Sequence, residues 1–441
     1  MGRGENCDAV LGHSRDFRVD WDIYGERRRN NLRRHKPNRL ILGLTFGLMA
    51  VGLIVIFAIG PQRANFMNSL YETSYSSNYF FIHQLIAVAV AVAAFVLGYF
   101  LPYEKYSKFS KWFLLGAILL NLLLFVLAFA GHYESSGLVK CELGACRWLN
   151  LGPVGFQPAE ALKLALTFYL PGLVMKHKKQ GTIESRDFLI PFGIVMAIAL
   201  LFTVVLQKDM GTGVVIGAIG LAVLWMSGIS AWKFWTIVAV VAVGGVLMIV
   251  SSPHRMERMM TYSGEGDADS NYHIDNALLA IGTGGIFGVG IGNSVQATGY
   301  LPESINDSVF AVMGETFGFV GLMLVLAAFM VLLFTLIRTA ENVLDEYSMV
   351  VTGVMAWVGA HVVVNVAAMV GLIPLTGITL PLLSYGGTSM MFVAFSLGLS
   401  MQISRLTSRE ASIAEDMVAA KKRFTRRKKE ESMAGPKRRN R

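Results

Sequence analysis

The chain has 441 residues, of which 54% are hydrophobic and 16% are charged, and its formal net charge is +9. Soluble proteins carry about 25% charged residues, so this composition excludes an ordinary soluble multidomain protein. The apolar residues come in blocks long enough to cross a bilayer, which predicts an all-α integral membrane protein.

Ten segments of about 20 mainly apolar residues are predicted to be transmembrane helices. In chain order they are 40–60, 80–101, 112–131, 159–175, 188–206, 212–229, 232–251, 309–337, 348–371 and 387–404. We expect them to form a polytopic bundle over residues 40–404, between the polar tails 1–39 and 405–441. Residues 252–308, between the seventh and eighth helices, are predicted to form a large extracytoplasmic loop.

The distribution of Lys and Arg predicts the orientation of this bundle. Most of these residues lie in the two tails, which places both termini in the cytoplasm by the positive-inside rule. The basic tails are expected to contact anionic lipid headgroups rather than nucleic acid. No signal-peptide pattern precedes the first span, so we expect that span to be retained.

The three cysteines fall into two groups. Cys7 lies in the amino-terminal tail, whereas Cys141 and Cys146 share a predicted outer loop. Their spacing permits a small closed ring, and the sequence leaves open whether this disulfide forms. The segment offers too few ligands to predict a zinc site.

A polar segment precedes the fourth span and continues into it. Pro158 followed by Glu160 is typical of a helix start. Lys163 lies on the same helix face as Glu160 but inside the apolar span, where an ionisable group is costly and by default functional. Two alternatives stay open: a structural Glu160–Lys163 pair, or a cation that faces the substrate.

The predicted outer loop ends close to two carboxylates. Its Gly-rich stretch 280–292 contains no G-x-G-x-x-G window, so it predicts tight turns packed on the membrane domain rather than a phosphate site. Asp307 suits either the N-cap of the next helix or a catalytic role. Glu315 lies about two turns inside that helix, where a carboxylate is either protonated or paired.

Two further breaks interrupt the apolar pattern on the outer side. Segment 373–387, which includes Ser384 and Tyr385, carries Pro, Gly and hydroxyl residues at membrane depth. Such a broken helix is tolerated where it is buried or lines a cavity. Lys208 and Asp209 form a shorter break. The remaining polar residues within the spans are expected to hydrogen-bond between helices; they are His83, Gln84, His361 and Asn365.

Four signatures, in this order along the chain, resemble the SEDS family of cell-wall polymerases, the FtsW, RodA and SpoVE proteins. They are Arg147-Trp148 with Gln157-Pro158-Ala159-Glu160-x-x-Lys163; Asp209-x-Gly211-Thr212; Gly284-Gly285 through Leu301-Pro302-Glu303 and Asp307-x-x-Phe310-Ala311-Val312-x-Gly314-Glu315; and Pro381-Leu382-Leu383-Ser384-Tyr385-Gly386-Gly387. The resemblance covers residues 40 to about 404.

The resemblance implies a bacterial peptidoglycan glycosyltransferase in the cytoplasmic membrane. Such an enzyme polymerises lipid II at the outer face, releases undecaprenyl diphosphate and works with a class B penicillin-binding protein that cross-links the glycan. The long charged tails resemble FtsW more than RodA, which implies synthesis at the division septum alongside other division proteins. Asp307 is the implied catalytic base. The implied substrate-binding residues are Arg147, Gln157, Glu160, Lys163, Lys208, Asp209, Glu315, Ser384 and Tyr385.

Three departures from the family pattern affect these roles. Asp307 is followed by Ser308 where an aromatic residue is usual, and Glu315 is followed by Thr316 rather than by a second acid. A second carboxylate at that place is therefore not expected to be essential. In the span that begins near residue 80, the family commonly has Arg before Gln, whereas this chain has His83 before Gln84. A cationic role at that place is therefore in doubt.

The expected chemistry needs only one base. Pyrophosphate leaves as a stable anion, so no general acid is required, and one carboxylate with several cations suffices for an inverting transfer. Mg²⁺ or Mn²⁺ is an additional candidate for neutralising the pyrophosphate, although the sequence shows no ligand cluster for it. The alternatives are a lipid II flippase, a RodA-like elongation polymerase and a non-catalytic scaffold. A flippase would be expected to show two related halves with broken helices in matching positions. The sequence shows no such pair of halves.

Overall fold

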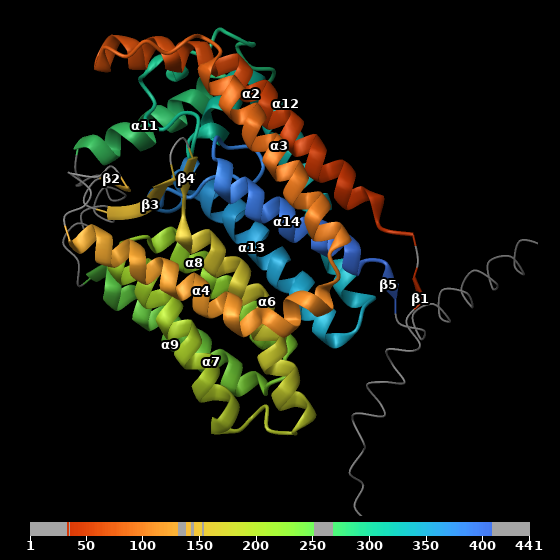
Figure 1. Cartoon of the computed structure of the whole chain (residues 1–441). Coiled ribbons are helices and arrows are strands. Elements are labelled where there is room, and N and C mark those ends of the chain that lie inside the picture. The colour runs from red at the N-terminus through yellow and green to blue at the C-terminus, as the bar shows by residue number, and fades with distance from the viewer. Residues whose placement is uncertain are drawn as a thin grey trace, which may run out of the picture. The chain divides into compact units, whose positions relative to one another are not determined.

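The computed structural model describes residues 33–34, 36–130, 138–142, 145–151, 154–250 and 268–407. The chain divides into two compact units, and the larger, His35–Arg405, contains the described helices (Figure 1). In the smaller unit, the described part is an antiparallel pair of strands, β1 (Arg33–Arg34) and β5 (Leu406–Thr407). Most of both predicted tails lies outside the described residues.

Each predicted span coincides with a helix of the described chain. The helices are α2 (Arg39–Tyr71), α3 (Tyr79–Phe100), α4 (Tyr103–Phe129), α6 (Pro158–Lys179), α7 (Arg186–Leu200) continued by η1 (Leu201–Leu206), α8 (Met210–Met226), α9 (Ala231–Val250), α12 (Val309–Glu341), α13 (Asp345–Met369) and α14 (Gly387–Ile403). Within the described residues, seven of them are long and apolar enough to cross a membrane, namely α2, α3, α4, α7 with η1, α9, α12 and α13. The count of ten crossings stays a prediction.

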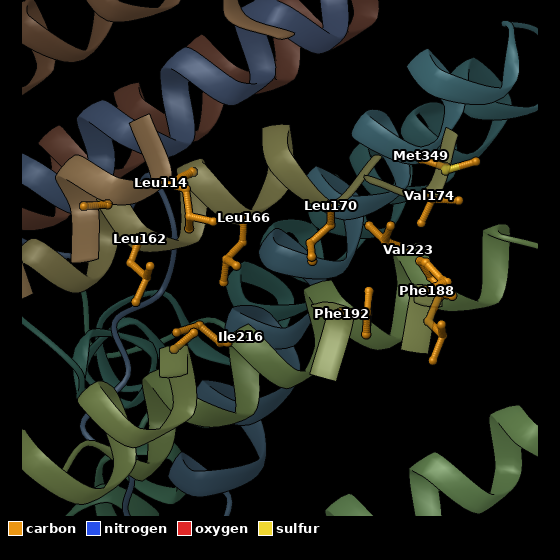
Figure 2. Close-up of a cluster of buried hydrophobic side chains, with 14 of the residues drawn as sticks. Leu114, Leu162, Leu166, Leu170, Val174, Phe188, Phe192, Ile216, Val223 and Met349 are labelled. Atoms are coloured by element: carbon orange, nitrogen blue, oxygen red, sulfur yellow. The ribbon is translucent and has the colours of Figure 1, made fainter. Parts of the chain in front are cut away.

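Helix α6 lies in the middle of a large apolar cluster. Leu162, Leu166 and Leu170 repeat at a spacing of four residues, so they share one face of α6, and all three are fully buried. Figure 2 shows this face against side chains from α4, α7, α8 and α13. The position of the α6 amino terminus is therefore fixed by packing on several neighbours.

Helices α3 and α14 approach each other closely because both carry glycine at the contact. A Cβ at Gly98 would lie 2.3 Å from the carbonyl oxygen of Phe395, and a Cβ at Gly398 would lie 2.1 Å from that of Phe95. Close approach at small residues is a common way for membrane helices to pack. Any larger side chain at either position would force the two backbones apart.

The predicted outer loop before α6 contains a small antiparallel sheet of β2 (Val139–Glu142), β3 (Ala145–Leu151) and β4 (Val154–Phe156). Cys141 and Cys146 form a disulfide across β2 and β3, which settles the alternative that the sequence left open. Val139 and Leu149 pack with Leu124 of α4, so the sheet is attached to the helical bundle.

Part of the segment predicted as a large loop is also helical. It contains α11 (Ala268–Thr283) and the short helix η2 (Gln296–Thr298), while residues 251–267 lie outside the described part. Helix α12 covers the span predicted at 309–337 but contains a break. Gly318 has a φ of +67° and a ψ of −168°, which breaks α12 into two helical pieces.

The Gly-rich stretch packs against this break and satisfies its backbone groups. The amide of Phe319 donates to the carbonyl of Gly285 at 2.9 Å, and the amide of Val289 donates to the carbonyl of Glu315 at 2.9 Å. A Cβ at Gly288 would lie 2.2 Å from the carbonyl oxygen of Thr316. This arrangement confirms the predicted tight turns, because irregular backbone at membrane depth requires protein partners.

Candidate active site

Asp307 lies in the turn directly before α12, and the structure does not use it as a cap. The N-cap residue of α12 is Ser308, so the N-cap alternative for Asp307 was wrong. The backbone carbonyl of Asp307 accepts a hydrogen bond from Asn365 Nδ2 at 2.7 Å. Its carboxylate oxygen Oδ1 is buried and has no hydrogen-bond partner in the described structure.

The surroundings of Asp307 favour its protonated form. Burial, reinforced by the nearby carboxylate of Glu303, raises the pKa of Asp307 to about 7, although two backbone amides and the Arg147 guanidinium act in the opposite direction. A carboxylate with a pKa near neutral pH is suited to general base catalysis, because it is both available and able to hold a proton.

Arg147 extends from β3 toward the same place. Its Nη2 donates to the carbonyl of Lys208 at 2.9 Å, and its Nε donates to the carbonyl of Gln207 at 3.3 Å. A Cβ at Gly377 would lie 3.8 Å from Arg147 Nη1 and 3.9 Å from Asp307 Oδ2. The guanidinium and the carboxylate therefore face a common point beside the Gly377 backbone.

Gln157, Lys208 and Asp209 build the frame around Arg147. Asp209 caps α8 by accepting hydrogen bonds from the amide and the hydroxyl of Thr212, at 3.0 and 2.9 Å. Gln157 Nε2 lies 3.5 Å from Asp209 Oδ2. Lys208 has a φ of +52°, its carbonyl accepts the hydrogen bond from Arg147, and its side chain is exposed. Lys208 is the member of this group whose side chain is open to a ligand.

Lys163 lies deep in the bundle and is fully enclosed. Its Nζ donates to Glu160 Oε1 at 2.8 Å and to His361 Nε2 at 3.0 Å, and it lies 5.3 Å from the centre of the Trp357 ring. Because an ammonium group can only donate, Nε2 is the acceptor and Nδ1 of His361 donates to the Thr379 carbonyl. This geometry favours the structural Glu160–Lys163 pair over a cation that faces the substrate.

Glu315 is buried and paired with donors from the preceding loop. Its carboxylate accepts hydrogen bonds from the Ser294 hydroxyl at 2.5 Å and from the amides of Val295 and Gln296 at 2.9 and 3.2 Å. The side chain thereby holds the start of η2 against α12. Of the two alternatives for this carboxylate, the structure shows the paired one.

Ser384 and Tyr385 join the loop before α14 to the rest of the site. The Ser384 hydroxyl accepts from the Leu380 amide at 2.8 Å, and Gln84 Nε2 donates to the Ser384 carbonyl at 3.3 Å. The amide of Tyr385 donates to the carbonyl of Ile305 at 2.8 Å. These residues position the loops around Asp307 and Gly377.

The predicted hydrogen bonds between helices are confirmed in part. His361 of α13 meets Lys163 of α6 as predicted, whereas Gln84 donates to the loop before α14 and Asn365 Nδ2 donates to the Asp307 and Ile378 carbonyls, which also lie in loops. The prediction was wrong for His83, whose ring Nδ1 lies 2.9 Å from the Tyr79 carbonyl oxygen of its own helix. Asn365 and Gly377 were missed as site residues, because nothing in the local sequence shows which loop each of them meets.

No three His, Cys, Asp or Glu side chains gather to bind a metal ion among the residues that the structure describes. A divalent cation at Asp307 would therefore take most of its ligands from water and from substrate phosphate, as Mg²⁺ commonly does.

Sequence comparison places the chain among known proteins. A family model described as a cell cycle protein, FtsW/RodA/SpoVE, matches residues 38–409. The chain belongs to the FtsW/RodA/SpoVE family. It is 31% identical over 387 residues to a protein of Escherichia coli O6:H1 named probable peptidoglycan glycosyltransferase FtsW, covering 86% of this chain and 88% of the relative. It is 32% identical over 373 residues to stage V sporulation protein E of Bacillus subtilis, covering 84% and 97%.

Solved structures share this fold. A chain from a peptidoglycan synthase complex that coordinates polymerization and crosslinking matches with a TM-score of 0.65 and 21% identity, covering 84% of this chain and 98% of that one. The crystal structure of Thermus thermophilus RodA matches with a TM-score of 0.57 and 23% identity, covering 84% and 97%. The apolar helices and the family membership together identify an integral membrane protein.

Proposed function

We propose that this FtsW/RodA/SpoVE family member is a peptidoglycan glycosyltransferase that polymerises lipid II at the outer face of the cytoplasmic membrane. The activity named for its relatives supports this proposal. The observation that carries it is the Asp307 carboxylate, which has a buried oxygen without a hydrogen-bond partner among the described residues and faces the same point beside Gly377 as the Arg147 guanidinium.

In the proposed reaction, Asp307 takes the proton from the 4-hydroxyl of the acceptor GlcNAc. The acceptor oxygen forms a bond to the anomeric carbon of the donor MurNAc on the face opposite the leaving group. The bond from that carbon to the pyrophosphate oxygen breaks, and its electron pair leaves with undecaprenyl diphosphate. The configuration at the anomeric carbon is therefore inverted.

The charge that develops on the leaving pyrophosphate needs cations nearby. Arg147 is held on two backbone carbonyls by Nε and Nη2, and its Nη1 faces the point shared with Asp307. A preorganised guanidinium suits phosphate oxygens in both geometry and charge. The exposed Lys208 side chain supplies a second cation from the same frame.

A lipid II flippase is the competing function, and the geometry around Lys163 favours it less. A transport site is expected near the membrane midplane with access from both sides. Lys163 is the cation that such a site would use, but Glu160, His361 and Trp357 enclose it, and its side chain is 0% exposed.

The proposal extends to partners and location. A class B penicillin-binding protein as partner is supported by the fold shared with the polymerization and crosslinking complex. The long basic tails support the septal role over the elongation role, with both termini cytoplasmic and near anionic lipids. Other division proteins are further proposed partners at the septum.

The decisive experiment is purification in detergent, with and without the penicillin-binding protein, followed by gel analysis of glycan made from lipid II. Glycan strands and released undecaprenyl diphosphate are the expected products. Movement of lipid II across vesicle membranes, with no glycan under either condition, would overturn the proposal in favour of the flippase. Depletion in cells separates the roles, because loss of a septal enzyme produces filaments and loss of an elongation enzyme produces round cells.

A further inference from the structure

The β2–β3 hairpin has an irregular register at Arg147. In the ladder, Lys140 pairs with Trp148 and Cys141 pairs with Cys146, and the register shifts between Lys140 and Cys141. Arg147 therefore has no opposite residue in β2 and is the extra residue of a β-bulge. A bulge redirects the side chain of the extra residue away from the ladder, and here that side chain reaches the Gln207 and Lys208 carbonyls.

The Cys141–Cys146 disulfide lies directly beside this bulge. It joins the two strands at the pair immediately before Arg147, on the side toward the hairpin turn. On the other side, the pairing of β3 with β4 begins only at Leu149. The backbone at Arg147 is thus held by a covalent bond on one side and by the ladder on the other.

We propose that the Cys141–Cys146 disulfide positions Arg147 for the lipid-linked donor, so that reducing the bond weakens use of the donor while the protein stays folded. This inference rests on the proposed function, because it assigns Arg147 to the pyrophosphate. Reduction transfers two electrons from a dithiol or phosphine to the sulfur–sulfur bond, which breaks, and two protons complete the two thiols. Reoxidation by a soluble disulfide, which takes up the two electrons and the two protons and leaves as two thiols, returns the bulge to its ordered position.

The surroundings of the disulfide allow such a local effect. Both cysteines are half-buried, so a small reductant can reach them. Val139 and Leu149 are almost fully buried against Leu124 of α4, and these contacts do not depend on the bond. Reduction is expected to loosen the hairpin near Arg147 without detaching the sheet from α4.

The test uses a Cys7→Ser background, in which the disulfide pair holds the remaining cysteines of the chain. The full-length protein is assayed on lipid II before and after tris(2-carboxyethyl)phosphine, with alkylation and mass spectrometry to count free thiols. We expect no free thiols before reduction and two afterwards. The kcat/KM for lipid II should then fall about tenfold, the size expected when one charged hydrogen-bonding group is misplaced. Most of this fall should come from a raised KM, because the pyrophosphate is already an anion in the bound donor.

Two variants separate positioning from a general loss of stability. The Cys141→Ser, Cys146→Ser double variant should show the raised KM without reductant and no response to it. Arg147→Ala should show a raised KM and also no further response, because the group that the disulfide positions is gone. Melting temperatures in detergent should change little on reduction in all of these proteins.

The inference is overturned if the reduced parent keeps its KM, if two thiols are free before reduction, or if Arg147→Ala still responds to the reductant. These results are distinct from failure of the proposed function. If the proposed function is wrong, the oxidised parent itself makes no glycan, and the thiol count is unaffected.

Discussion

Asp307 and Glu315 are two carboxylates near the start of α12, and they differ in their hydrogen bonding. Glu315 accepts hydrogen bonds from a hydroxyl and two backbone amides. Asp307 has an enclosed oxygen without a hydrogen-bond partner in the described structure and a pKa raised to about 7 by burial. A fully bonded carboxylate stabilises the loop it holds, whereas an unsatisfied one is costly to the fold and is free to take a proton.

The largest expected effect is that of Asp307→Asn on catalysis. The amide preserves the size of the side chain but cannot accept the proton, so the rate of glycan synthesis should fall about 10²–10⁴-fold. Turnover of lipid II and the melting temperature in detergent are the measurements. Asp275→Asn, on an exposed position of α11, is the matched control and should keep its turnover. Near-normal synthesis by Asp307→Asn would remove the base assignment.

Lys163→Met should act mainly on stability. The change leaves Glu160 buried without its cation, and removal of one partner of a buried pair costs about 3–5 kcal/mol. The free energy of unfolding in detergent should drop by this amount, and the Glu160→Leu, Lys163→Met double variant should recover part of it. If Lys163→Met instead stays stable and loses binding of lipid II, the cation faces the substrate after all.

Glu315→Gln should also lower the free energy of unfolding, but by less than Lys163→Met does. The amide keeps one accepting oxygen but places an NH2 donor against either the Ser294 hydroxyl or the Val295 amide, which donate to different oxygens of Glu315, so we expect a loss of about 1–3 kcal/mol. Ser294→Ala removes one of these bonds and should cost less than Glu315→Gln. Glycan synthesis per folded molecule should stay far above that of Asp307→Asn. A folded Glu315→Gln protein without turnover would contradict the contrast between the two carboxylates.

The pH dependence provides the mildest test. Since the base must be ionised, kcat/KM should rise about tenfold per pH unit and level off near pH 7. Glu303→Gln removes a charge that raises the pKa of Asp307, so this rise should move to lower pH. A pH profile that is unchanged in Glu303→Gln would show that Glu303 does not act on the base.

Asp307 should affect stability in the opposite direction to catalysis: as the pH rises, catalysis increases and the free energy of unfolding decreases. The folded protein binds this proton more tightly than the unfolded chain, whose ordinary value is 3.8. Its contribution is therefore present at low pH and is lost as the pH rises from about 4 to about 7. Asp307→Asn should remove this part of the pH dependence in unfolding measurements.

The sequence by itself determined where the helices lie. Apolar blocks of span length coincide with helices, and Pro158 marks the start of α6 as expected, because hydropathy and helix-start chemistry are local properties. The family signatures also contain Arg147 and Asp307, the two residues that converge at the site. The polar breaks around them were visible for the same reason, since polar and Gly or Pro residues stand out within apolar runs.

Only the tertiary structure decided what each polar residue does. Asp307 is a cap by local pattern, yet its neighbours come from Arg147 on β3, Asn365 on α13 and the backbone at Gly377. The break at Gly318 and the enclosure of Lys163 likewise depend on segments far apart in the chain, whereas the bulge at Arg147 depends on the register of β3 against the neighbouring strand β2. Hydropathy and residue spacing do not show which of these contacts form.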